Sequence, residues 1–201
     1  MANQSELKVH GIQFVDLNRD ELVRTRLGAS YTGLDYLRLP KTVLGSNFIV
    51  SMPKVKAHHW SGVTLSMKNM FGVIPGIKYG WPKNILHRKG IQQSILDVCA
   101  TVPIHFVIAD AVIAMEGNGP LNGTPRPLWT VVLADDPVAA DASCARLMGL
   151  EPDRVSHIHE ASRFLGNSSS AVIDQLGEVL QRPRVPFQVV PEFRHLTAVY
   201  S

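Results

Sequence analysis

The sequence is poor in cysteine and has no long apolar run. Of its 201 residues two are cysteines, Cys99 and Cys144, and both lie in helix-like patterns among apolar neighbours. We therefore expect buried thiols rather than a disulfide, and the count excludes a metal site built on cysteine alone. No apolar run reaches the roughly 18 residues that a membrane helix needs. The first residues lack the basic and apolar regions of a secretory signal, so we expect no membrane partner and a cytoplasmic location.

Runs of lysine and arginine are absent as well. The net charge is +3, with 45% hydrophobic and 18% charged residues, which is ordinary globular composition and favours one domain or two small ones. A mildly basic chain helps an anionic ligand to approach, but it does not by itself predict a nucleic-acid groove. Nucleic-acid binding is our third alternative, kept open by Trp60, Tyr79 and Trp81 near the lysines.

The stretch from residue 51 to residue 76 carries the densest chemistry. It follows a predicted buried strand at residues 47–52, which Pro53 ends. In an extended chain, Lys54, Lys56 and His58 alternate and point to one side. A helix should follow, because apolar residues recur at helical spacing on one face, with Lys68 on the polar face and Asn69 beside it. These groups gather where open α/β sheets bind ligands. The alternative is a solvated basic loop before an amphipathic helix.

The rest of the chain alternates strand-like and helix-like segments. We predict strands at residues 9–17, 34–39, 104–109, 128–134 and 171–176, and helices at residues 90–102, 136–148 and 154–165. Residues 18–27 fit a short helix or an exposed connection. Asp136 and Pro137 are a good helix start, and Gly149 a good end. Asp141 is then either a first-turn acid or a site residue. His157 and His159 are two residues apart and cannot share a helical face, so we expect surface histidines.

Two segments rich in glycine and proline are predicted as long loops. Residues 73–89 fit a lid, in which His87 is either a surface residue or a site residue. Residues 110–123 begin with Asp110 at the end of a buried strand and contain Glu116. Their glycines can present backbone N–H groups to an anion. This segment is neither a dinucleotide fingerprint nor a P-loop. It is a turn-rich connector or part of a cleft, and we favour the cleft.

Several separated motifs resemble the DUF362 family of uncharacterised proteins. The family pattern is roughly PKxKxH, xxKNxxG, D-x(5)-EGxGPxxG and DPVAxD, and the resemblance spans about residues 34–177. The matching residues are Pro53, Lys54, Lys56, His58, Lys68, Asn69, Gly72, Asp110, Glu116, Gly117, Gly119, Pro120, Gly123, Asp136, Pro137 and Asp141.

The resemblance implies an association with iron–sulfur proteins and a redox-linked role, because many members carry a ferredoxin-like segment. This chain departs from that pattern, since two distant cysteines cannot ligate such a cluster. Members usually have an amino-terminal α/β portion ahead of the PKxKxH motif. Only about fifty residues precede the motif here, so the chain resembles a short or amino-terminally truncated member, which puts any site residues from that portion in doubt.

Together these features predict an α/β fold with a mixed or mainly parallel sheet, helices on both faces and long loops at the carboxyl edge of the strands. We expect a single domain at residues 1–180, with the family-like core at about 34–177, and an extended tail at residues 181–201.

The first functional hypothesis is an enzyme or ligand-binding domain for a small anionic ligand. The ligand-binding residues expected are Lys54, Lys56, Lys68, Asn69, Gly117, Asn118, Gly119 and His87. His58, Asp110 and Glu116 would supply proton transfer or hold a divalent metal. The sequence does not reveal a reaction, or whether there is one.

The second hypothesis is a non-catalytic accessory module. Its basic edge would dock an acidic partner, such as an iron–sulfur electron-transfer protein, through complementary charge. Self-association into a homo-oligomer is a further expectation. Lys54 substitutions would then weaken association in a salt-dependent way, whereas Glu116→Gln would change little. Under the enzyme hypothesis, Glu116→Gln would abolish ligand or metal binding while the fold survives.

Overall fold

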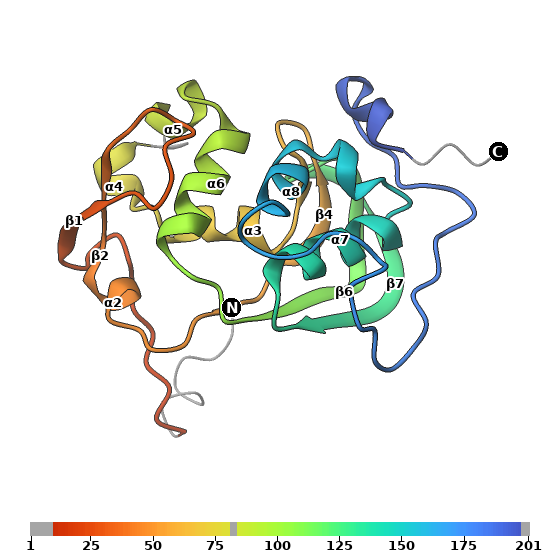
Figure 1. Ribbon diagram of the computed structural model, residues 1–201, viewed down its shortest axis with the longest axis horizontal. Helices are drawn as coiled ribbons and strands as arrows, with labels where there is room; N and C mark the ends of the chain where they lie inside the picture. Colours follow the sequence, from red (N-terminus) through yellow and green to blue (C-terminus); the bar gives the residue numbers. More distant parts are fainter. Residues whose placement is uncertain (1–9, 81–83, 198–201) are drawn as a thin grey trace.

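A computed structural model describes residues 10–80 and 84–197. Strands β1 (Leu22–Arg26) and β2 (Tyr36–Pro40) form a small antiparallel sheet at one end of the molecule (Figure 1). Leu37 and Leu39 of β2 are buried and Arg38 between them is exposed, which confirms the alternation predicted for residues 34–39. The helix or connection predicted at residues 18–27 contains a strand instead, because pairing with β2 stabilises it.

Within the described residues the larger sheet has five strands and is mixed, which confirms the predicted α/β class. Its central strand, β6 (Phe106–Asn118), runs parallel to both β3 (Val50–Ser51) and β4 (Lys54–His58), which pair with successive parts of it. On its other side β6 pairs antiparallel with β7 (Asn122–Ala134). Strand β5 (Gly62–Thr64) pairs antiparallel with β4 and ends the sheet.

Helices fill the space between the two sheets and lie over the larger one (Figure 1). None of the described helices is long and apolar enough to cross a membrane. The α-helices are α2 (Lys41–Leu44), α3 (Ser66–Asn69), α4 (Gly76–Tyr79), α5 (Asn84–Arg88), α6 (Ile91–Thr101), α7 (Pro137–Leu147) and α8 (Ser156–Ala161), and the 3₁₀-helices are η1 (Met70–Val73), η2 (Pro152–Arg154) and η3 (Pro191–Leu196).

Helix α7 starts as the sequence predicts. The Asp136 carboxylate accepts hydrogen bonds from the backbone N–H groups of Val138 and Ala139, and Pro137 occupies the first turn. Ala140 and Ala142 are fully buried, and the helix contacts both β6 and β7. Small side chains thus let α7 pack closely against the sheet.

The predicted loop at residues 110–123 is wrong, because these residues form the distal half of β6, a tight turn and the start of β7. Their glycines and prolines are typical of a loop. Pro125 and Pro127, however, lie on an edge strand, where a missing N–H removes no ladder bond on the open side. Asp110 therefore lies within a strand rather than at its end.

Other boundaries also differ from those predicted. The strand at residues 47–52 is shortened to β3, and residues 10–17 and 171–176 form no strand. Strand β5 takes the first residues of the predicted helix after Pro53, so that helix begins only at Ser66. The predicted lid at residues 73–89 contains α4 and α5, with residues 81–83 outside the described part. The helix predicted at residues 154–165 is limited to α8.

The segment after Gly177 has little regular structure but is anchored to the domain. Phe187 and Leu196 are buried. The backbone N–H of Phe187 donates to the carbonyl of Met148, and that of Glu151 donates to the carbonyl of Leu196. The division into a domain at residues 1–180 and a tail at 181–201 stays a prediction.

Candidate functional site

Strand β4 carries Lys54, Lys56 and His58, but the structure separates the first from the other two. Lys54 pairs with Asp110 of β6, whereas Lys56 pairs with Met115, so the register of β6 shifts between them. The Lys54 ammonium contacts the Asp110 carboxylate at 2.5 Å, which lowers the pKa of Asp110. Lys54 and Asp110 are thus neutralised by each other on a half-exposed surface.

Beyond the register shift lies a group of lysines, histidines and aromatic rings that we call the basic–aromatic cluster. The rings stack in series: His58 on His59 at 5.0 Å between centroids, His59 against Trp60 at 4.8 Å, and Trp60 against His87 at 4.9 Å. It consists of Lys56, His58, His59, Trp60, Lys68, Phe71 and His87. The predicted association of β4 with His87 is therefore present.

Phe71 closes the series. Its ring contacts His87 at 6.0 Å and lies 4.7 Å from the Lys68 ammonium. Lys68 and Phe71 are three residues apart in α3 and η1, which places both side chains on one side of the helix. The Lys68 charge also acts on His58 of β4, so it lies near that strand.

His58 is buried in the cluster as a neutral ring. Its Nδ1 accepts the backbone N–H groups of Trp60 at 3.0 Å and Ser61 at 3.3 Å, so the ring proton lies on Nε2. Burial, with a further contribution from the nearby Lys68, His59, Lys56 and His87, lowers the pKa of His58 to about 3. These four charged neighbours are all cations or potential cations. A carboxylate is not among them.

We expect His58 to make the folded state sensitive to acid. The unfolded chain takes up a proton as the pH falls through 6.5, whereas folded His58 stays neutral until about pH 3. Its stabilisation is complete above 6.5 and is lost as the pH falls. Between about pH 7 and about pH 5 the wild type should lose roughly 2 kcal/mol more than His58→Asn, which keeps an acceptor.

Urea unfolding at the two pH values measures this difference. His10→Asn, at an exposed histidine, is the matched control and should lose as much stability as the wild type. Equal losses in wild type and His58→Asn would contradict a neutral buried His58.

Lys56 and Thr64 are directly paired across β4 and β5, so their side chains lie on the same face of the sheet. Partial burial lowers the pKa of Lys56. The Thr64 hydroxyl is buried and has no hydrogen-bond partner within residues 10–80 and 84–197. A buried hydroxyl without a partner is unfavourable unless a ligand or solvent satisfies it.

A second buried polar atom without a partner belongs to His157. The surface position predicted for this residue is wrong, because the side chain is fully buried under α6. Its Nδ1 bonds the Gln92 side-chain oxygen at 2.5 Å, and the Gln92 amide donates to the Ser61 carbonyl. Burial, with a smaller contribution from Lys68, lowers the pKa of His157 to about 3. Nδ1 therefore carries the proton, and Nε2 is an acceptor without a partner in the described chain.

The sequence offered one signal for a buried His157. Ala161 follows it by four residues and lies on the same side of α8, and it is fully buried. Two histidines that are two residues apart cannot bind one metal ion from the same helical face. This spacing does not indicate whether either side chain is buried. Gln92 gave no such signal.

Glu116 anchors the carboxyl-terminal segment. Its carboxylate contacts the Arg126 guanidinium at 2.7 Å and accepts the backbone N–H of Gln188 at 3.0 Å. The Arg126 guanidinium donates to the carbonyls of Val185 and Pro186. These contacts explain an acid at this position by packing.

The predicted glycine-rich anion cradle packs against protein groups. The Gly117 N–H donates to the Gln188 carbonyl, and the Gly119 carbonyl accepts the His59 backbone N–H. A Cβ at Gly119 would lie 2.1 Å from the Ala57 carbonyl oxygen, so only glycine fits. Asn118 is exposed at the hairpin end, and the Asn69 amide donates to the Ser51 hydroxyl.

The proposed metal ligands do not come together. His58 is buried in the cluster, Asp110 pairs with Lys54, and Glu116 pairs with Arg126. Within the described part of the chain, no three His, Cys, Asp or Glu side chains are placed to hold a metal ion. A separate cavity of about 370 Å³ lies between α6 and the start of α7, lined in part by Cys99, Pro103 and Asp135, and includes none of the cluster residues.

Comparison with known proteins places this geometry in a family context. The family described as "Domain of unknown function (DUF362)" matches residues 3–146. A thylakoid-associated protein of Synechocystis is 25% identical over 177 residues, which cover 86% of this chain and 54% of that protein. The chain thus spans about half the length of this relative. No solved structure matches. The thylakoid association is a property of that relative. The cytoplasmic location expected for this chain stays a prediction.

Proposed function

The chain belongs to the DUF362 family, and from this premise we propose that the basic–aromatic cluster binds a small oxyanion. The observation that carries the proposal is the concentration of positive groups around His58, together with two buried polar atoms, on Thr64 and His157, that find no partner among the described residues. Lys56, Lys68 and His87 act on His58, and none of the groups that shift its pKa is a carboxylate. Several positive groups around one buried ring favour the binding of an anion.

The donors and acceptors of the cluster indicate the form of the oxyanion. Lys56 and Lys68 supply charge, and His58 carries a donor at Nε2. Thr64 can donate or accept, while His157 Nε2 can only accept. Lys68 shifts the pKa values of both His58 and His157, so the two rings lie near the same ammonium. An oxyanion that keeps one O–H group, as phosphate does at neutral pH, would use both kinds of partner.

The Lys68→Met variant tests this function. Removal of one of two charges that contact the anion should weaken inorganic phosphate binding by at least about tenfold, because hydrogen bonds to charged groups contribute about 1.5–3 kcal/mol. Isothermal titration calorimetry with inorganic phosphate measures the change.

Lys41→Met is the matched control, since Lys41 lies in α2 and pairs at the surface with Glu21. It loses the same charge and should bind phosphate like the wild type. If both variants bound phosphate equally more weakly, the effect would be one of net charge, which would contradict a site at the cluster. A wild type that binds no phosphate would contradict it as well.

The accessory-module hypothesis has less support. It assigned Lys54 to a basic docking edge, and Lys54 already contacts Asp110. A metal-assisted or redox reaction likewise stays a prediction without support from the arrangement of the described residues. Phosphate binding that survives high salt would favour a ligand site over a docking edge, because exposed charge pairs between proteins are screened.

A further inference from the structure

One face of the larger sheet carries exposed apolar side chains, and we call it the outer face. Val50 pairs with Phe106, Ile108 with Leu133 and Asp110 with Val131. Paired side chains lie on the same side of a sheet, and alternate residues point to opposite sides. Ser51, Val107 and Ala109 therefore point inward, where they are buried. The outer face consists of Phe48, Val50, Met52, Phe106, Ile108, Trp129, Val131 and Leu133 around the Lys54–Asp110 pair.

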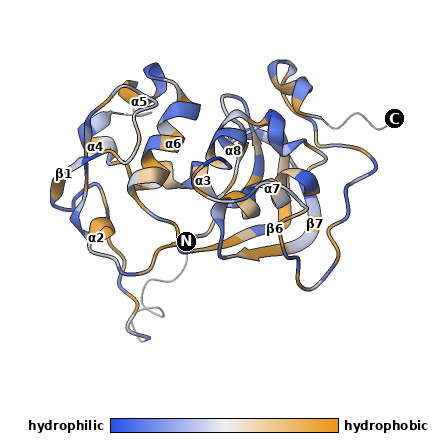
Figure 2. Ribbon diagram, viewed as in Figure 1, coloured by the Kyte–Doolittle hydropathy of each residue, from blue (hydrophilic) through white to orange (hydrophobic). Residues whose placement is uncertain are grey.

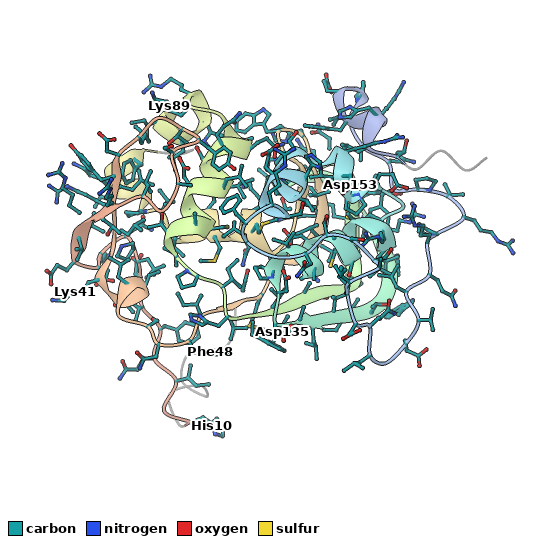
Figure 3. All side chains as sticks on the ribbon, in the orientation of Figure 1. His10, Lys41, Phe48, Lys89, Asp135 and Asp153 are labelled. Atoms are coloured by element: carbon teal, nitrogen blue, oxygen red, sulfur yellow. The ribbon has the colours of Figure 1, made fainter. Side chains whose placement is uncertain are left out.

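The outer face lies at the upper end of what a monomer usually leaves exposed. Trp129 is 76% exposed, Met52 66% and Leu133 61%. With about 150–250 Å² for a large aromatic side chain, the face presents on the order of 600 Å² of apolar surface. Figure 2 shows the hydrophobic residues along β6 and β7, and Figure 3 places Phe48 and Asp135 at the same lower edge of the molecule. Apolar patches of this size mark interaction sites.

The backbone conformation at Trp129 also favours an interaction site at the outer face. Its φ is 53°, in the left-handed region that bulky side chains avoid, and it lies where the β6–β7 register shifts. Such a conformation is unfavourable for a residue with a bulky side chain. Since most of the Trp129 side chain is exposed, burial within this chain does not offset the strain. A partner that covers Trp129 would.

We propose that two copies of the chain pack through their outer faces as a two-fold dimer. A pleated face fits a second such face about 10 Å away. With the side chains around the patch, the area approaches the roughly 800 Å² per partner of a stable interface. Lys54 and Asp110 carry opposite charges on this face. A two-fold axis brings each charge near the opposite charge of the other copy. A lipid surface would leave this pair desolvated without new partners.

Sedimentation velocity of the full chain over a wide concentration range tests the proposal. We expect a concentration-dependent dimer, with Trp129→Asp and Leu133→Asp each weakening dimerisation by at least about tenfold, as central interface residues do. Both positions are exposed, so circular dichroism should be unchanged. Leu176→Asp is the matched control, because Leu176 is 92% exposed and lies outside the outer face. It should dimerise like the wild type.

Two outcomes would overturn the proposal. The first is a wild type that stays monomeric at every concentration. If that monomer binds phosphatidylglycerol vesicles in a Trp129-dependent way, the outer face would be assigned to lipid binding instead. The second is a dimer that neither variant on the face weakens, which would place the interface elsewhere. Neither measurement depends on phosphate binding, so the dimer and the anion site are tested independently of each other.

Discussion

Replacing Asp141 with alanine should lower the free energy of unfolding by about 3 kcal/mol, the largest effect expected of a single substitution here. The Asp141 carboxylate is fully buried in α7. It accepts the backbone N–H groups of Ser66 and Met67 and the hydroxyl of Ser66. Alanine would leave these donors at the start of α3 buried without an acceptor. Because α3 carries Lys68, phosphate binding should weaken as well.

Chemical denaturation of Asp141→Ala measures the loss. Asp35→Ala is the matched control, because Asp35 is exposed, and its stability should stay within about 0.5 kcal/mol of the wild type. A stable Asp141→Ala that lost only ligand binding would show instead that Asp141 acts in the site, the other role that the sequence left open.

The Arg126→Met variant should release the carboxyl-terminal segment and lower the free energy of unfolding by about 2 kcal/mol. Arg126 holds the carbonyls of Val185 and Pro186, lies 4.6 Å from the Phe187 ring and pairs with Glu116. Methionine keeps much of the packing but leaves the Glu116 carboxylate, which is mostly buried, without its cation. The peptide bond between Arg184 and Val185 should then become sensitive to trypsin.

Limited trypsin digestion followed by mass spectrometry checks this result. The control is Arg163→Met, since Arg163 forms an exposed pair with Glu160 that contributes little. Its cleavage after Arg184 should proceed at the wild-type rate. An Arg126→Met variant with unchanged cleavage would show that the Arg126 contacts do not anchor the segment.

Local sequence signals predicted much of the fold. The cap at Asp136 and the apolar run from residue 104 identified α7 and the core of β6 correctly, because capping and buried strands are determined by neighbouring residues. The β6–β7 hairpin was missed because its prolines are tolerated only on an edge strand. That position is set by distant pairing and is not visible in a local pattern.

The candidate site divides in the same way. The sequence grouped Lys54, Lys56, His58 and Lys68, and in the structure Lys56 and Lys68 both act on His58 whereas Lys54 pairs with Asp110. Asp110 and Glu116 were assigned to the same cleft because of their order after a strand, but each lies beside a cation that the sequence could not place there. The shift in register between Lys54 and Lys56 separates Lys54 and its partner Asp110 from Lys56. His157 and Gln92 joined the site only through tertiary packing.

The central claim is that the basic–aromatic cluster binds an oxyanion, and the most direct test observes its histidine rings during a phosphate titration. Long-range ¹H–¹⁵N spectra of the full chain resolve ring nitrogens. We expect the Nε2 signals of His58 and His157 to shift together with one dissociation constant, while exposed His10 stays unchanged. Shifts confined to exposed histidines, or none on any ring, would contradict the claim.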